Sequence, residues 1–268
     1  GVNLDAARNV KGAVLALSGA DLKDVLPPIS GMQVTAPKTW RDGMDPQIEI
    51  PDQALMAYDK LRYVGEPYAL VVAENRYIAE DAAELIDGQF KPLSSVASAE
   101  AARVEGAALV HDHLPGNVAA SLHAKTGEGA AALELAPHRL KRRYYHHRYA
   151  AMPMECRGVI AEFDSRTGGI TVWSSTQVVH WVRREVANAL DMPEERVRVI
   201  APDVGGGFGG KGHVYPEDIL VAYLAKKLGR PVKWLEDRHE HLLNAAHSRD
   251  NLFDIEVGFD DEGKISAI

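Results

Sequence analysis

The most chemically informative segment is the glycine-rich stretch DVGGGFGGK at residues 203–211. Five of the six residues from 205 to 210 are glycine, which lets a backbone approach a ligand closely and adopt positive φ angles. Successive N–H groups in such a loop can bind an anion. Phe208 is an isolated aromatic side chain in this loop, and we interpret it as covering a bound group. A tightly turned structural loop without a ligand is the simpler alternative.

A dinucleotide-binding motif is partly matched in this segment. Gly205, Gly207 and Gly210 fit GxGxxG, with a predicted strand before the loop, a predicted helix after it and Glu236 at the end of the next strand. In that motif the helix begins directly after the turn, so that its N-terminus faces the pyrophosphate. Here residues 213–216 separate the glycines from the helix. The sequence therefore disfavours this hypothesis.

A P-loop is matched less well by the same residues. Gly205, Gly210 and Lys211 fit GxxxxGK. However, Gly212 occupies the position where Ser or Thr should bind magnesium. The pattern therefore gives no basis for nucleoside triphosphate binding.

Other groups of polar side chains are assigned no chemistry. His146 and His147 are adjacent on a predicted strand and point to opposite faces, so they cannot chelate one metal ion together with His138. The HDH segment at residues 111–113 lies in a predicted loop without a third spaced ligand. The mixed charges of residues 236–240 are typical of solvated or internally paired groups. We therefore name no metal ligand and no catalytic residue.

The elements that must position the glycine loop are short strands mixed with helices. Apolar periodicity and turn residues predict strands at 12–17, 68–73, 159–163, 170–174, 196–201, 231–236 and 253–259. The strands at 159–163 and 170–174 are expected to form a hairpin around the Gly-Gly turn at 167–169. Helices are predicted at 20–25, 76–86, 180–190 and 216–228, the last with Pro216 in its first turn and Gly229 closing it. We expect a turn-rich loop at 30–46, a long connection at 98–136 and a final hairpin turn entering a strand whose partner is missing.

Length, composition and net charge narrow the classes to which this protein can belong. A chain of 268 residues favours about two domains, and no apolar run reaches the roughly 18 residues of a membrane span. A net charge of −8 argues against a general nucleic-acid binder. The single cysteine, Cys156, excludes an internal disulfide and cysteine ligation of an iron-sulfur cluster by this chain. Without a visible export signal at residues 1–10, we expect a cytoplasmic protein, and the absence of an initiator Met indicates an incomplete chain.

Several motifs in a fixed order resemble the large subunits of molybdenum hydroxylases, the family of xanthine dehydrogenases, aldehyde oxidases and aerobic carbon monoxide dehydrogenases. The resemblance covers nearly the whole chain, and several ordered motifs are more specific than one. In order, they are LRYVGEPYALVVAENRYIAEDAAELI at 61–86, LVHDHLPGNVA at 109–119, MPMECRGVIAEFD at 152–164, VWSSTQVVHWVR at 172–183, VRVIAPDVGGGFGGKGHVYPED at 197–218 and LGRPVKWLEDRHE at 228–240.

The resemblance implies an α+β fold, a domain organisation, a cofactor and partners. Residues 1–100 would form an N-terminally incomplete α/β hammerhead domain, 101–136 a connecting segment, and 137–268 a C-terminally incomplete first molybdopterin-binding domain. The cofactor would be a molybdopterin-type molybdenum cofactor, with the cytosine dinucleotide among its forms. The remainder of the large subunit, an iron-sulfur small subunit and an FAD-binding medium subunit would complete an oligomeric complex that has no nucleic acid and no membrane span.

The resemblance also implies site residues. In the family, a glutamine and the Phe-Gly of the glycine loop approach the molybdenum ligands, which carries over to Gln177, Phe208 and Gly209. An amide can donate a hydrogen bond to such a ligand, and we expect Gly207 in the same loop to need a special φ and close approach. Gly212 stands where xanthine-type members have an acidic residue, which disfavours a purine substrate. Cys156 stands where relatives commonly have Pro.

The implied activity is hydroxylation of an aldehyde, heterocycle or similar small substrate with oxygen derived from water. The family's general-base glutamate lies outside the matched segments, so we expect the isolated chain to be inactive and to hold no cofactor stably. Two alternatives remain at this point: a nucleotide-binding βαβ protein and a non-catalytic assembly chain that retains the fold.

Overall fold

The computed structural model of the protein describes residues 1–31, 50–121 and 123–268. Its contacts divide the chain into two compact units. Among the described residues, the first unit contains 1–31, 50–118 and 152–245, and the second contains 119–121, 123–151 and 246–268. This division does not follow the predicted boundaries at residues 100 and 137. Most of the predicted loop at 30–46 lies outside the described residues.

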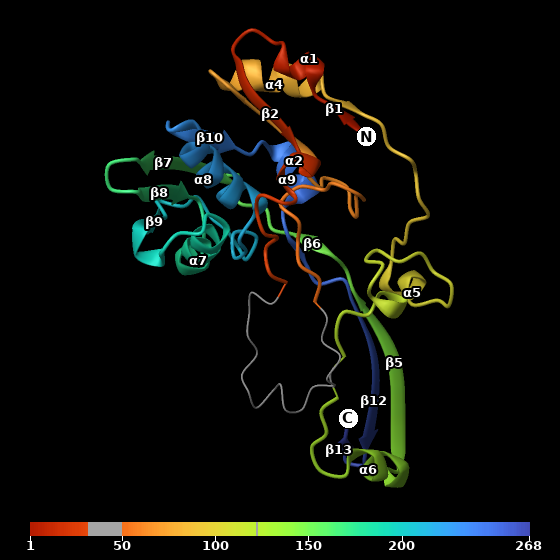
Figure 1. Cartoon of the computed structure of the whole chain (residues 1–268). Helices are drawn as coiled ribbons and strands as arrows, with labels where there is room; N and C mark the ends of the chain where they lie inside the picture. The colour runs from red at the N-terminus through yellow and green to blue at the C-terminus, as the bar shows by residue number, and fades with distance from the viewer. Residues whose placement is uncertain (32–49, 122) are drawn as a thin grey trace. The chain divides into compact units, whose positions relative to one another are not determined.

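A four-stranded sheet in the order β10-β7-β8-β9 organises the first unit (Figure 1). Strands β7 (Gly158–Asp164) and β8 (Gly169–Ser174) form the predicted antiparallel hairpin, whose turn includes Gly168 at φ +67°. Strand β9 (Val197–Ile200) pairs parallel to β8, and β10 (Val232–Leu235) pairs antiparallel to β7. All four strands confirm the predictions from apolar alternation.

Helices α7 (Val179–Ala189) and α8 (Pro216–Leu228) pack against each other and against this sheet. Helix α8 begins with Pro216, whose fixed φ suits a first helical turn. It ends before Gly229, which adopts the left-handed conformation that glycine accommodates without strain. Both helices were predicted. The core beneath them contains Val159, Ala161, Ile170, Val172, Val182, Val186, Ile219, Ala222 and Ala225.

Shorter elements complete the described part of the first unit. They are β1 (Val2–Asn3), α1 (Asp5–Arg8), β2 (Ala13–Ser18), α2 (Gly19–Leu22), β3 (Ala69–Ala73), α4 (Arg76–Glu84), β4 (Asp87–Gly88), α5 (Ala99–Ala102), η1 (Pro115–Asn117), η2 (Glu194–Arg196) and α9 (Arg238–Asn244). Strands β2 and β3 pair antiparallel, and α1 and α4 cover a small core around Leu4 and Ala82. This confirms the predicted strands and the predicted helix near residues 76–86.

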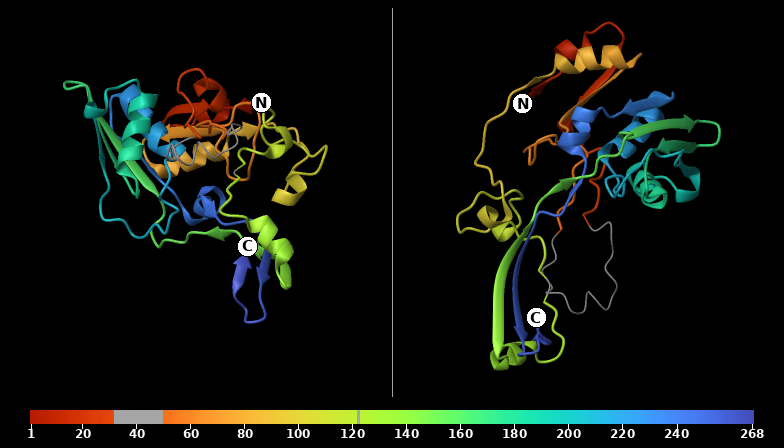
Figure 2. Two further views of the ribbon diagram at one scale, coloured as in Figure 1. Left: turned by 90° about the horizontal axis from the view of Figure 1, so that it is seen from below. Right: turned by 180° about the vertical axis from the view of Figure 1, so that it is seen from behind.

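The second unit is a long antiparallel ribbon with a helix at one end, which Figure 2 shows from two sides. Strand β5 (His138–His146) pairs along its whole length with β12 (Asn251–Phe259), and α6 (Gly129–Leu135) packs beside β12 and β13 (Ile265–Ala267). A second pair joins β6 (Tyr149–Ala150) to β11 (His247–Ser248).

One expectation for these segments was wrong. The segment at 98–136, which is predicted to be a long connection between domains, contains α5, η1 and α6. The last strand, β13, does have a partner: it pairs antiparallel with β12 after a turn in which Gly263 adopts φ +80°. The sequence did not reveal that pairing because β12 was interpreted only as an isolated apolar strand. No helix in the described ranges is long and apolar enough to cross a membrane.

Candidate functional site

The candidate site forms where two parallel strands end. Strands β8 and β9 are parallel neighbours joined by α7, so their carboxyl ends lie at the same edge of the sheet. Gln177 follows β8, and the glycine loop follows β9. The Gln177 N–H donates to the carbonyl of Lys211 at 2.9 Å, which joins the two segments. Ligands of open sheets that contain parallel strands commonly bind at this edge.

The Gln177 side chain has a fixed orientation. The N–H of Gly209 donates to Gln177 Oε1 at 3.1 Å. Because that oxygen is taken up by the loop, the amide NH₂ group is directed elsewhere, and it has no partner among the described residues. The site therefore presents a hydrogen-bond donor whose direction is set by the glycine loop. This brings together two of the predicted residues.

The glycine loop has an unusual backbone. Gly206, Phe208 and Gly209 have positive φ angles of 92°, 49° and 91°. Phe208 is 79% exposed. The N–H groups of Gly207 and Phe208 make no hydrogen bond within the described chain. The loop therefore carries an exposed aromatic ring and two available donors.

Gly207 lies against the Gln177 side chain. It does not adopt a positive φ angle, so that expectation was wrong. The expected close approach to a ligand stays a prediction. Within the chain, a Cβ atom at Gly207 would lie 2.5 Å from Gln177 Oε1, so the Gln177 side chain would have to move. At Gly209, by contrast, a Cβ atom would meet nothing within 4 Å, and the space beside it is open.

Glu155 and Lys211 hold the two ends of the loop. Glu155 Oε2 accepts the Gly205 N–H at 2.9 Å and the Lys211 ammonium at 2.6 Å. The Lys211 side chain is 0% exposed, and the Glu155 carboxylate is the counter-ion that compensates for its burial. Burial raises the pKa of Glu155, but the hydrogen bonds from Lys211 and Gly205 lower it further, so the net shift is downward. The sequence analysis missed Glu155, because only the fold brings it to Lys211.

A buried ionic cluster lies next to the ion pair of Glu155 and Lys211, which we call the clamp. Arg157 is bound to Glu236 through Nε at 2.8 Å and Nη2 at 2.6 Å, and to Glu217 through Nη1 at 3.1 Å. Its guanidinium also lies over the Tyr215 ring, 3.7 Å from the centroid. Burial alone would lower the pKa of Arg157, but the carboxylates of Glu217 and Glu236 raise it above its ordinary value. The charges expected at residues 236–240 are thus internally paired at Glu236.

A side chain of the protein itself accepts a hydrogen bond at the N-terminus of α8. Asp218 is 4% exposed and accepts from Ser174 Oγ at 2.7 Å and from the Tyr215 N–H at 3.1 Å. Burial raises the pKa of Asp218 to about 6. An intrinsic carboxylate at this helix end leaves no free N-terminus for a pyrophosphate, which disfavours the dinucleotide hypothesis.

The histidines that the sequence analysis assigned no chemistry remain outside this site. His138 pairs with Asp261 at 2.8 Å in the second unit. The rings of His111 and His113 contact each other edge to face, with centroids 5.8 Å apart. Within the described residues, none of these side chains belongs to a group of three metal-ligand atoms.

The chain matches the molybdopterin cofactor-binding domain family over residues 110–268. The chain belongs to this family. It is 35% identical to the nicotine 6-hydroxylase large subunit of Paenarthrobacter nicotinovorans, over 100% of this chain and 32% of that protein. It is 32% identical to the carbon monoxide dehydrogenase large chain of Hydrogenophaga pseudoflava, over 80% of this chain and 28% of that protein.

The fold is likewise similar to that of a solved enzyme structure. The structure of quinoline 2-oxidoreductase from Pseudomonas putida 86 superposes with a TM-score of 0.85 at 35% identity, covering 99% of this chain and 32% of that one. The resemblance to molybdenum hydroxylase large chains and the α+β fold are therefore confirmed. The chain spans about a third of the length of these relatives.

Proposed function

We propose that this chain forms one wall of the molybdenum cofactor site in a hydroxylase large subunit. The observation that carries the proposal is the orientation of Gln177: its Oε1 is bound by the Gly209 N–H at 3.1 Å, so its NH₂ group faces away from the loop. Phe208 lies one residue from Gly209 and is exposed. An amide donor and an aromatic ring thus occur together at the end of two parallel strands.

The residues present fit a molybdopterin-type cofactor. Gly207 and Phe208 offer N–H donors without partners in the described chain, and the space beside Gly209 is open. Gln177, Phe208 and Gly209 would approach the metal end of the group, and Gly207 would allow the loop to lie against Gln177. When bound, the cofactor would supply the two-electron redox chemistry of hydroxylation.

The roles of the protein groups follow from their types. The Gln177 NH₂ group would donate a hydrogen bond toward a position where negative charge develops, and a preoriented donor there lowers the barrier. The Phe208 ring would exclude water from the substrate side of the site. Glu155 and Lys211 would hold the loop ends so that both groups keep their positions.

The substrate and partners are part of this proposal. Two of the relatives, nicotine 6-hydroxylase and quinoline 2-oxidoreductase, are named for nitrogen heteroaromatic compounds, and both are 35% identical to this chain. This supports a heterocycle among the expected aldehydes, heterocycles and similar small molecules. Other relatives are named as single subunits, a complex subunit gamma and a large chain, which supports a multi-subunit complex. We propose iron-sulfur and FAD-binding subunits as its other members. We also propose the hammerhead assignment for residues 1–100, the cytosine dinucleotide form of the pterin and a cytoplasmic location.

Gln177 variants of the enzyme purified with its partner subunits test the function. Gln177→Glu keeps an acceptor for the Gly209 N–H but removes the NH₂ donor and adds a negative charge. We expect reduction of the redox centres by substrate in a single turnover to slow about 10²-fold to 10³-fold, with normal molybdenum and pterin content. Gln177→Ala should also loosen the loop, because it removes the acceptor.

Asn188→Ala, at an exposed position on α7, is the matched control and should reduce normally. An unchanged reduction rate in Gln177→Glu at full molybdenum occupancy would refute the role of Gln177. Protein that contains no molybdenum or pterin in the assembled complex would instead support the non-catalytic assembly chain.

A further inference from the structure

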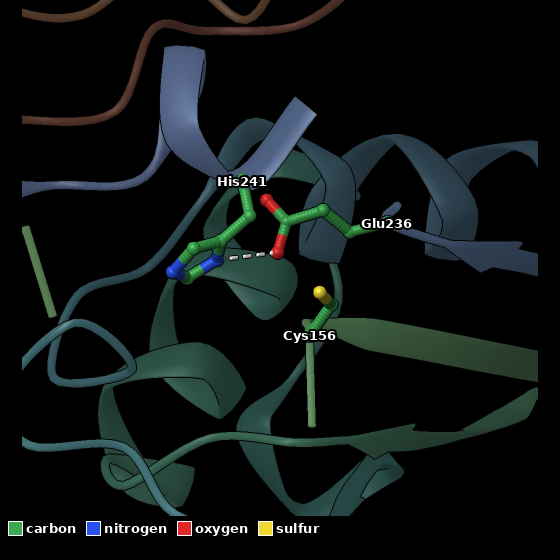
Figure 3. Close-up of side chains that lie close together, drawn as sticks. All are labelled: Cys156, Glu236 and His241. Atoms are coloured by element: carbon green, nitrogen blue, oxygen red, sulfur yellow. Dashed lines mark hydrogen bonds and ion pairs between the residues drawn. The ribbon is translucent and has the colours of Figure 1, made fainter. Parts of the chain in front are cut away.

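A second group of ligand-type side chains lies away from the glycine loop. The Cys156 Sγ, a Glu236 carboxylate oxygen and a His241 ring nitrogen all lie within 4.8 Å of one another (Figure 3). The side chains of Glu236 and His241 are 0% and 1% exposed. Figure 3 shows the three side chains pointing toward one another, with His241 Nδ1 bound to Glu236 at 2.9 Å.

Three elements bring these distant residues together. The antiparallel pairing of β7 with β10 continues past the strand ends, where the Glu236 N–H donates to the Arg157 carbonyl at 3.0 Å. This places Cys156 beside Glu236. Helix α9 starts immediately afterwards, with Asp237 as its N-cap in a capping box with Glu240. The first turn of α9 then carries His241 back over Glu236.

Glu236 can keep its existing partner while binding a cation. Arg157 Nε and Nη2 both donate to Oε1 of Glu236. The second oxygen, Oε2, accepts from His241 Nδ1 and from the Arg157 backbone N–H. A metal ion at Oε2 would therefore replace the His241 contact and leave the guanidinium pair intact.

Two carboxylates share one arginine beside this group. Arg157 contacts both Glu236 and Glu217, whose side chains are 0% and 13% exposed. Buried carboxylates are stabilised by nearby positive charge. A cation bound at Glu236 would add positive charge at this position, and a coordinating thiol loses its proton on binding.

We propose that Cys156, Glu236 and His241 bind a thiophilic divalent cation, for which Zn²⁺ has the matching ligand preferences. Thiolate sulfur, imidazole nitrogen and carboxylate oxygen are its ordinary ligands, and water can take the fourth position. On binding, the sulfur–metal bond forms as the Cys156 proton leaves to solvent, and the His241 proton moves from Nδ1 to Nε2. The ion would join the start of β7 to α9, independently of the function proposed for the glycine loop.

Cobalt substitution gives a direct test on the 268-residue chain. Cys156 is its single cysteine, so any thiolate-to-cobalt charge-transfer absorption must arise from this residue. We expect the band to saturate at one Co²⁺ per chain and to disappear when Zn²⁺ is added. Cys156→Ser should abolish the band, whereas His239→Ala, an exposed position in the same helix, should retain it.

Alkylation of the same thiol keeps the test decisive if a variant fails to fold. Zn²⁺ should slow the reaction of Cys156 with iodoacetamide in the wild-type chain, under conditions where a cooperative thermal transition confirms folding. The absence of a charge-transfer band in the folded chain, or an alkylation rate unchanged by Zn²⁺, would overturn the proposal.

Discussion

The glycine loop and the Arg157 cluster lie within one unit but use their polar groups in opposite ways. In the cluster, Arg157 and Glu236 are 5% and 0% exposed in their side chains and bind each other. In the loop, Phe208 is exposed, and the N–H groups of Gly207 and Phe208 have no partner in the described chain. Groups paired inside the protein stabilise the fold, whereas groups left unpaired at a strand end are available to a ligand.

The two regions are joined through one short segment. Glu155 reaches the loop through Gly205 and Lys211, and Arg157, two residues later, reaches Glu236 and Glu217. The cluster therefore fixes the segment from which the loop is held. If this is correct, changes in the cluster should lower stability, and changes at the clamp should act mainly on the loop.

The largest expected effect is on stability, from Arg157→Met. This variant leaves the buried Glu236 carboxylate and the Glu217 carboxylate without their cation, which should cost about 3–5 kcal/mol in the free energy of unfolding. Denaturant unfolding measures it. Arg183→Met, which removes an exposed pair with Glu194, should cost no more than about 1 kcal/mol. Similar losses in both variants would show that the cluster has no special structural role.

A smaller effect, confined to the loop, is expected from Glu155→Gln. The variant keeps an oxygen acceptor but leaves the buried Lys211 ammonium without a counter-charge, which should cost about 1–3 kcal/mol. Hydrogen exchange should accelerate at the amides of residues 205–210 more than in the sheet. Glu162→Gln, at an exposed position on β7, is the control. Exchange that rises equally in β7 and in the loop would contradict a local clamp.

The pH dependence of stability tests the buried end of α8. Burial raises the pKa of Asp218 from 3.8 to about 6 in the folded chain. Its contribution to stability is therefore present below pH 3.8 and is lost as the pH rises through about 6. The difference in unfolding free energy between wild type and Asp218→Asn should change across this window. A difference that stays constant across this window would contradict the raised pKa of Asp218.

Local elements could be predicted from the sequence because their signals are local. The Gly-Gly turn predicted the hairpin of β7 and β8, and Pro216 and Gly229 marked the ends of α8. The ordered motifs indicated Gln177, Phe208 and Gly209 through the resemblance. Partners distant in sequence gave no such signal: Glu155 with Lys211, Arg157 with Glu236, and β13 with β12 depend on how the strands pair.

Gly207 shows this limit of sequence-based prediction at a single residue. The sequence predicted that Gly207 needs a special φ and a close approach to a ligand. The structure shows no positive φ at Gly207, and a Cβ atom there would lie 2.5 Å from Gln177 Oε1. The neighbours Gly206 and Gly209 adopt the positive φ angles instead. A pattern of glycines does not say which of them is limited by backbone conformation and which by contact.

The most direct test of the central claim is the molybdenum and pterin content of the Gly207→Val variant, assembled and purified with its partner subunits. A Cβ atom at residue 207 would lie 2.5 Å from Gln177 Oε1, so valine must move the Gln177 side chain out of its contact with the Gly209 N–H, and we predict that cofactor incorporation is lost. Gly129→Val, where a Cβ atom meets nothing within 4 Å, should load normally and serves as the control. Normal molybdenum and pterin content in Gly207→Val would contradict the account and reduce the glycine loop to a structural turn.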